Sequence, residues 1–204
     1  MNVKICGIKD KVTLKYISAH PHPPKFIGMI LNYSKSPRFV SLKKAKELTK
    51  IKSPCKYVAV LVAPTIKFLN SIKNINFEYW QIYNLEPEKI KFIKKKYKKK
   101  VIVAITIKNK IDVEAYKLYK GFSNIILFDS KGFEKSKSFN HSFLKSVPNS
   151  IKKMIAGNIK TKDIYNFKNS PYILDVSGAL ETKKGIKDMN KIDKFLNTVH
   201  NINS

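Results

Sequence analysis

Short runs of apolar, β-branched and aromatic residues alternate along this chain with longer stretches of helical spacing. Several of the runs are apolar without interruption, which is typical of strands that are buried on both faces in a parallel sheet. The pattern predicts eight strands, over residues 3–8, 26–31, 57–62, 79–83, 101–105, 124–129, 150–156 and 172–177.

Helix-start chemistry marks several of the stretches between the runs. Ser41 is a good N-cap residue before a helical stretch, and Pro87 stands where a first helical turn begins. Ile90 and Ile93 follow Pro87 at the i, i+3 spacing of a buried helix face. Asp188 is placed to cap a last helix.

Alternating strands and helices predict a parallel α/β fold. Eight such units in 204 residues give about 25 residues per unit, which fits a compact (β/α)8 TIM barrel formed by residues 1–204 as one domain. A doubly wound open sheet is the main alternative. It usually carries a Gly-rich first turn, and neither G-x-G-x-x-G nor G-x-x-x-x-G-K-[ST] occurs in the sequence, so a dinucleotide or P-loop site has no support.

Composition narrows the class of protein. The chain is 43% hydrophobic and 27% charged, which is typical of a globular protein. Its longest apolar run without a charge, residues 57–66, has ten residues, whereas a membrane-spanning helix needs about 20. The only two cysteines, Cys6 and Cys55, suit a reducing compartment. A cytoplasmic protein without a membrane segment is expected.

The net charge of +27 would ordinarily suggest a nucleic-acid partner. However, 40 of the 41 basic residues are Lys and only Arg38 is Arg, whereas proteins that bind nucleic acid specifically rely on the bidentate guanidinium. The abundance of Lys, Asn, Ile, Phe and Tyr indicates AT-rich codon usage, so no specific nucleic-acid binding is expected. The same bias makes Arg38 informative, because it stands where Lys does not substitute. The dense lysine run at residues 94–100 is interpreted as a solvated helix end.

In such barrels the functional side chains come from the carboxyl ends of the strands and from the loops that follow them. Cys6 ends the first predicted strand and Asp129 ends the sixth, on opposite sides of the mouth. A thiol and a carboxyl facing each other across a ligand suit a general base and a general acid. Arg38 follows the second strand, and the loops that begin at Gly157 and Ser177 follow the seventh and eighth, where such barrels often bind phosphate.

Three motifs, in the same order and spacing, carry a family resemblance: Lys4-Ile5-Cys6-Gly7, Lys35-Ser36-Pro37-Arg38, and Asp175-Val176-Ser177-Gly178 with the residues after it. From residue 3 to about residue 197 the chain resembles phosphoribosylanthranilate isomerase. The resemblance implies a (β/α)8 barrel that acts in tryptophan biosynthesis. It also implies an Amadori rearrangement of N-(5-phosphoribosyl)anthranilate to 1-(2-carboxyphenylamino)-1-deoxyribulose 5-phosphate, with no cofactor and no metal.

The resemblance also implies roles for individual residues. Asp129 is the general acid that protonates the furanose ring oxygen, and Cys6 is the general base that removes the C2′ proton. Arg38 holds the anthranilate carboxylate. The phosphate is bound by backbone N–H groups of Gly157, Asn158, Gly178 and Ala179. Burial is expected to raise the pKa of the Asp129 carboxyl, and a nearby positive charge such as Lys4 is expected to lower that of the Cys6 thiol.

The chain departs from the family pattern at four places. It has Gln81-Ile82-Tyr83-Asn84 where the family has Gln-Leu-His-Gly, Gly157-Asn158 for a double Gly, and Ser177-Gly178 for a double Ser. Phe133-Glu134-Lys135-Ser136 replaces a Gly-rich loop. These changes bear on phosphate affinity and turnover more than on fold. Gln81 is a further candidate for contact with substrate, with a plain hydrogen-bonding role as the alternative.

Two other functions remain open on the sequence. The altered loops motivate a diverged barrel that binds a phosphorylated ligand or partner without isomerase turnover, although the intact Cys6, Arg38 and Asp129 argue against it. The lysine excess motivates a nucleic-acid binder. The expected partner is a small phosphorylated substrate, and the protein is expected to be a monomer.

Overall fold

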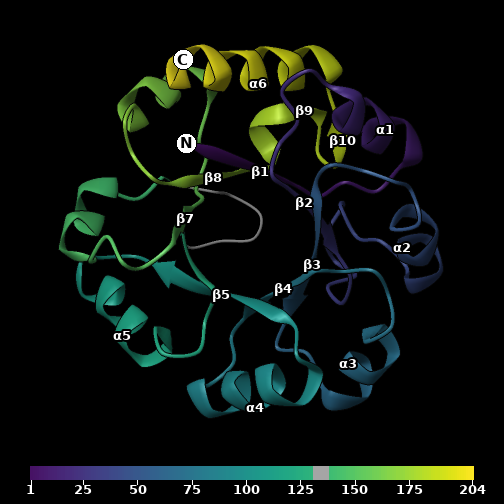
Figure 1. Ribbon diagram of the computed structural model, residues 1–204, viewed down its shortest axis with the longest axis vertical. Helices are drawn as coiled ribbons and strands as arrows, with labels where there is room; N and C mark the ends of the chain where they lie inside the picture. The colour runs from purple at the N-terminus through teal and green to yellow at the C-terminus, as the bar shows by residue number, and fades with distance from the viewer. Residues whose placement is uncertain (131–137) are drawn as a thin grey trace.

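The computed structural model describes residues 1–130 and 138–204. Eight parallel strands close into a barrel in which β1 pairs with both β2 and β8 (Figure 1). This confirms the predicted (β/α)8 barrel and rules out the open sheet. The strands are β1 (Asn2–Cys6), β2 (Phe26–Ile30), β3 (Lys56–Val62), β4 (Tyr79–Tyr83), β5 (Lys100–Ile107), β6 (Ile125–Ser130), β7 (Lys153–Ile155) and β8 (Ile173–Val176).

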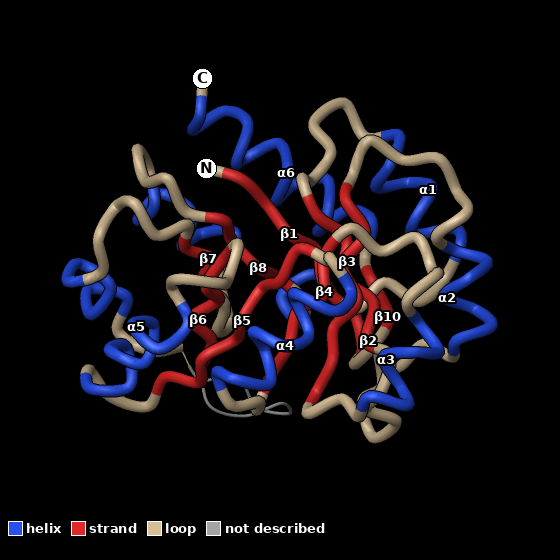
Figure 2. Tube along the Cα trace, turned by 60° about the horizontal axis from the view of Figure 1, so that its bottom comes forward, coloured by secondary structure: helices blue, strands red, loops and turns tan. Residues whose placement is uncertain are grey.

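Helices surround the barrel, so that the strands (red) lie between helical layers (blue) in Figure 2. The α-helices are α1 (Lys11–Ala19), α2 (Leu42–Leu48), α3 (Ile66–Ile72), α4 (Pro87–Tyr97), α5 (Tyr116–Tyr119) and α6 (Met189–Asn203). The remaining connections carry 3₁₀ turns and a small hairpin: η1 (Ile111–Ala115), η2 (His141–Ser146), η3 (Thr161–Phe167), η4 (Gly178–Leu180), β9 (Glu181–Lys183) and β10 (Ile186–Lys187). Within the described ranges, β6 and β7 are therefore followed by 3₁₀ turns in place of full helices.

The helix starts follow the sequence signals. The Ser41 side chain accepts a hydrogen bond from the Lys44 N–H, and the Asp188 carboxylate accepts one from the Lys191 N–H. Each of these caps satisfies one N–H group that the first helical turn leaves without a partner. Pro87 opens α4, where its missing N–H costs nothing. The predicted caps are confirmed.

The apolar interior consists of two layers. An inner layer fills the barrel itself with side chains that point toward its axis, among them Phe26, Tyr79 and Ile102. A larger outer layer packs between the strands and the helices and includes Ile27, Trp80 and Phe195. Successive residues of a strand face opposite sides, so each strand contributes alternately to both layers. The inner layer ends near the carboxyl ends of the strands, where a cavity begins.

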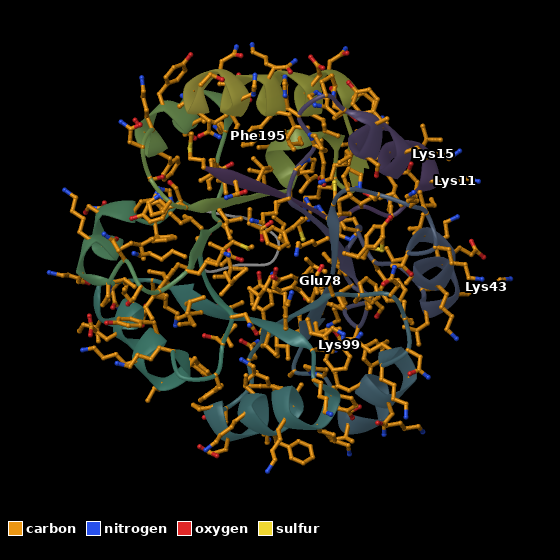
Figure 3. The ribbon with its side chains drawn as sticks, in the orientation of Figure 1. Lys11, Lys15, Lys43, Glu78, Lys99 and Phe195 are labelled. Atoms are coloured by element: carbon orange, nitrogen blue, oxygen red, sulfur yellow. The ribbon has the colours of Figure 1, made fainter. Side chains whose placement is uncertain are left out.

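The lysines lie mainly on the outside of the helical ring. Lys11, Lys15 and Lys43 point away from α1 and α2 into solvent (Figure 3). Residues 94–96 form the last turn of α4, so this part of the lysine run is the helix end that the sequence indicated, with its cations at the negative end of the helix dipole. Lys99 and Lys100 lie beyond the helix, where the Lys99 Nζ donates to the Phe77 carbonyl and Lys100 pairs with Glu78 at the start of β5. Within the described residues, no helix combines the length and the apolar character needed to cross a membrane.

Candidate active site

A cavity of about 150 Å³ opens at the carboxyl ends of the barrel strands. It brings together predicted site residues that lie far apart in the sequence: Cys6 from β1, Arg38 from the loop after β2, and Asp129 from β6. The loops after β7 and β8 complete the lining with the four residues assigned to phosphate, Gly157, Asn158, Gly178 and Ala179. Seven of the eight candidate residues therefore share one cavity.

Gln81 is the eighth candidate, and it is not among the described residues that line the cavity. It is fully buried on β4, one inward-facing position before Tyr83. Its Nε2 donates a hydrogen bond to the Tyr83 hydroxyl at 3.1 Å. This position fits the plain hydrogen-bonding role that the sequence left open.

Cys6 is packed against two inward-facing neighbours. Gly28 is its register partner on β2, and a Cβ atom there would lie only 3.0 Å from the Cys6 Sγ and 3.1 Å from the Lys4 Nζ. A distance of 3.0 Å is too short for ordinary packing against a side-chain atom, so the absent side chain of Gly28 makes room for the thiol and the ammonium group. The smallest residue on β2 thus fixes where the thiol can lie.

A buried ion pair lies beneath the thiol. The Lys4 Nζ is 2.9 and 2.8 Å from the two carboxylate oxygens of Asp175, its register partner on β8. Burial raises the pKa of the Cys6 thiol, and the charge of Lys4 opposes this rise without overcoming it. The expectation of a lowered thiol pKa is therefore wrong in its net direction, because desolvation outweighs the nearby cation.

Asp129 lies at the end of β6 and contacts Tyr83. The Tyr83 hydroxyl donates a hydrogen bond to the Asp129 Oδ2 at 2.9 Å. Burial raises the pKa of the Asp129 carboxyl to about 6, although the hydrogen bond from Tyr83 favours the ionised form and works in the opposite direction. The expected rise is confirmed, and it leaves a carboxyl that can carry a proton near neutral pH.

Arg38 is held by one edge of its guanidinium. Its Nε and Nη2 donate to the two carboxylate oxygens of Glu181 at 2.7 and 2.8 Å. Lys187 Nζ donates to the same carboxylate at 2.9 Å and the Gly185 N–H donates at 3.0 Å. Although burial acts against ionisation, these donors lower the pKa of Glu181 to about 2. The Nη1 group of Arg38 takes no part in this pair, so the guanidinium keeps a second edge for an anion.

Arg38 and Lys187 share the carboxylate of Glu181, and the three side chains form one charged cluster. Arg38 and Lys187 together carry two positive charges, and Glu181 carries one negative charge, so the cluster keeps one positive charge beside the cavity. Such a fixed, partly desolvated charge attracts an anion more strongly than an exposed lysine does.

The loops after β7 and β8 present backbone to the cavity. Gly157 has a φ of 108° and Asn158 has a φ of 52°, so both residues adopt conformations that side chains ordinarily disfavour. The 3₁₀ turn η4 begins at Gly178, and the first N–H groups of such a turn have no partner within it. The two loops are therefore suited to donate backbone hydrogen bonds to an anion.

The sequence comparison settles the family. A family model described as N-(5'phosphoribosyl)anthranilate (PRA) isomerase matches residues 3–198. The chain belongs to this family.

Individual relatives agree with the family model. The N-(5'-phosphoribosyl)anthranilate isomerase of Sulfurihydrogenibium sp. is 32% identical, over 98% of this chain and 100% of that protein. The crystal structure of the isomerase from Thermotoga maritima is similar with a TM-score of 0.87 at 23% identity, covering 98% of this chain and 99% of that one. A further isomerase structure, solved in complex with reduced 1-(o-carboxyphenylamino)-1-deoxyribulose 5-phosphate, has a TM-score of 0.85 at 22% identity and the same coverage.

Two of the departures from the isomerase family pattern preserve the backbone. Asn84 and Asn158 both stand where the family has Gly, and they have φ values of 55° and 52°. Asn is the residue other than Gly that best tolerates this left-handed region, so the turns survive the loss of glycine. The replaced Gly-rich loop, Phe133-Glu134-Lys135-Ser136, lies outside the described residues.

Some residues of this isomerase site were not assigned from the sequence. Lys4 was expected only as a positive charge near Cys6, and its ion pair with Asp175 was not foreseen. Glu181 and Lys187 occur within or beside the family motifs, but no role followed from their spacing. Ion pairs between strands far apart in the sequence become visible only when the barrel closes. The available signal was the placement of charged residues inside predicted strands that are otherwise apolar, at Lys4 and Asp175.

Proposed function

We propose that this protein catalyses the cofactor-independent Amadori rearrangement of N-(5-phosphoribosyl)anthranilate in tryptophan biosynthesis. The observation that carries the proposal is that Cys6 and Asp129 line the same cavity as Arg38 and the two phosphate-type loops. The substrate has a carboxylate, a sugar and a phosphate, and the cavity presents groups suited to each. Family membership supports the same conclusion.

In this proposal Asp129 starts the reaction. With a pKa of about 6, it holds a proton often enough near neutral pH to protonate the furanose ring oxygen. Protonation breaks the C1′–O bond and leaves a Schiff base between C1′ and the anthranilate nitrogen. Asp129 is then a carboxylate, which the Tyr83 hydroxyl stabilises by its hydrogen bond.

Cys6 then acts from the other side of the cavity. Its thiolate takes the C2′ proton, and the electron pair moves through C1′ onto the nitrogen to give an enolamine, which tautomerises to the ketone. Lys4, fully buried beneath Cys6, favours the thiolate by its charge. Asp129 gives one proton and Cys6 takes one, so the enzyme returns to its starting state after these protons exchange with product or solvent.

The anionic ends of the substrate fit the two charged regions of the mouth. We assign the anthranilate carboxylate to the Nη1 side of Arg38, whose other edge is occupied by Glu181. We assign the phosphate to the backbone N–H groups of Gly157, Asn158, Gly178 and Ala179. A family member has been solved in complex with reduced 1-(o-carboxyphenylamino)-1-deoxyribulose 5-phosphate, a ligand that carries both a carboxylate and a phosphate.

Replacing Arg38 with lysine is expected to raise KM about 10- to 100-fold while kcat changes little, because a lysine has no planar fork for the carboxylate. Steady-state kinetics of the variant check this. The double variant Lys35→Arg/Arg38→Lys is a matched control, since it restores a guanidinium in the same loop without the Glu181 contact. An unchanged KM in Arg38→Lys would show that Arg38 does not bind the carboxylate.

The dependence of kcat/KM on pH is expected to be unusual, because the acid has a lower pKa than the base. Below about pH 6 Asp129 is protonated, so kcat/KM rises with pH as more Cys6 becomes thiolate. Above about pH 6 each gain in thiolate is offset by loss of the Asp129 proton. The profile is then level until the raised pKa of Cys6 is reached. A decline that already begins at neutral pH would contradict the raised thiol pKa.

A coupled fluorescence assay tests the function itself. Anthranilate and phosphoribosyl pyrophosphate supply the substrate through the preceding transferase, and turnover is followed as loss of substrate fluorescence. We expect turnover by the wild-type protein. No turnover at high enzyme concentration, with retained binding of the reduced product analogue, would favour the diverged barrel without isomerase activity.

We further propose that the protein acts as a monomer in the cytoplasm, with a small phosphorylated substrate as its partner and no specific nucleic acid. The cavity is built from one chain, with Cys6, Asp129 and Arg38 all supplied by the same barrel. Sedimentation equilibrium tests the monomer.

A further inference from the structure

Tyr83 occupies the position at which the family motif has histidine. It ends β4, is buried, lines the cavity and donates its hydroxyl proton to Asp129 Oδ2 at 2.9 Å. The Tyr83 hydroxyl thus contacts the carboxyl group that is proposed as the general acid. A residue in direct contact with the acid is placed to control its orientation.

The contact between Tyr83 and Asp129 reaches across one intervening strand. Tyr83 is on β4 and Asp129 is on β6, with β5 between them. The register partner of Tyr83 on β5 is Ala104, which also faces the barrel interior. Its methyl group is small enough for the tyrosine to pass over it and reach the next strand. A larger residue at position 104 would stand between the phenol and the carboxyl.

The direction of the hydrogen bonds is fixed by Gln81. Its Nε2 donates to the Tyr83 hydroxyl at 3.1 Å, so that the hydroxyl oxygen accepts there and directs its single proton to Asp129. Since Asp129 Oδ2 accepts this proton, the acidic proton of neutral Asp129 belongs on Oδ1. The chain Gln81–Tyr83–Asp129 therefore selects which carboxyl oxygen carries the proton for transfer.

Resting on the proposed function, we propose that Tyr83 is the positioning residue of the general acid and that it replaces the family histidine in this role, with Gln81 orienting its hydroxyl. Tyr83 does not transfer a proton itself. It holds Asp129 so that Oδ1 points its proton toward the ring oxygen, and it stabilises the carboxylate after transfer.

Several charged groups face Asp129 and must be considered together. Asp175 on β8 raises its pKa through repulsion, and Lys4 on β1 lowers it. The Tyr83 hydrogen bond lowers it as well, by stabilising the charged form. Removal of the hydroxyl, with Asp175 and Lys4 left in place, must therefore move the pKa of Asp129 upward.

The test compares Tyr83→Phe, Tyr83→His and the control Tyr79→Phe, which removes a hydroxyl from an inward-facing residue on the same strand. Tyr83→Phe is expected to lower kcat about 10- to 100-fold with KM nearly unchanged, because the acid loses its alignment. The kinetic pKa near 6 is expected to move upward. Tyr83→His should recover most of kcat, and Tyr79→Phe should match the wild type. Unchanged kcat and pH profile in Tyr83→Phe would overturn the proposal.

A second measurement separates this inference from the proposed function. Carboxyl ¹³C NMR of aspartate-labelled protein follows the titration of Asp129 without turnover, with Asp129→Asn identifying the signal. An upward shift of the Asp129 midpoint in Tyr83→Phe supports the proposal, and an unmoved midpoint overturns it. An inactive wild-type protein in the coupled assay would refute the isomerase activity alone, because the titration still reports whether Tyr83 controls the acid.

Discussion

Replacing Cys6 with serine is expected to reduce kcat by about 10²- to 10⁴-fold while KM changes little, since proton abstraction by a positioned base contributes that much. A hydroxyl is smaller than a thiol, so serine fits the space beside Gly28 and the fold is retained. It does not ionise in the range where Cys6 does, even with Lys4 beneath it. The coupled fluorescence assay measures the loss.

Cys55 provides the matched control for this variant. It is buried like Cys6 but lies just before β3, outside the described cavity lining. Cys55→Ser should therefore keep wild-type kcat. If Cys6→Ser kept more than about a tenth of the wild-type kcat, a loss too small for removal of a general base, Cys6 would not be the base.

Replacing Asp129 with asparagine is expected to have an effect of similar size. Asparagine has nearly the same shape and its carbonyl can still accept the Tyr83 hydrogen bond, but it has no acidic proton to give to the ring oxygen. The expected fall in kcat is about 10²- to 10⁴-fold, with substrate binding largely kept. The pH profile should also lose the titration near pH 6, because Asp129 is its source.

Asp112→Asn is a suitable comparison for the Asp129 variant. Its carboxylate accepts hydrogen bonds from the N–H groups of Lys108 and Asn109 in an exposed turn after β5, and an asparagine carbonyl can accept them too. Asp112 is not among the described residues that line the cavity. Full activity is expected for this control. An active Asp129→Asn enzyme with an unchanged pH profile would assign the acid role to another group.

The barrel could be predicted from the sequence because its evidence is local. Runs such as the one that forms β3 are apolar over their whole length, and their regular alternation with helical stretches is enough to identify parallel strands. The turns after β6 and β7 were harder to predict from the sequence, because η2 and η3 are short 3₁₀ segments without a sustained apolar period. Local pattern therefore defined the strands better than the connections.

The residues of the site also fall into those that have a local sequence signal and those that do not. Cys6, Arg38 and Asp129 could be named because each ends a strand or follows one within a recognisable motif. The partners that tune them could not, since Tyr83 meets Asp129 across β5, and Glu181 meets Arg38 across 143 residues of sequence. The pKa of Cys6 was predicted in the wrong direction for a related reason. The presence of Lys4 is visible in the sequence, but the extent of burial that outweighs it is not.

The two layers of the apolar interior have different tasks: the outer layer holds the fold together, and the inner layer supports the cavity. The helices are attached through the outer layer, which includes Ile27, Trp80 and Phe195, so cohesion of the fold depends mainly on these contacts. The top of the inner layer forms the floor of the cavity, where Tyr83 replaces the family histidine. A neighbour of the proposed acid can therefore be exchanged at the mouth of the barrel, as Tyr83 for the family histidine, while the scaffold beneath it persists.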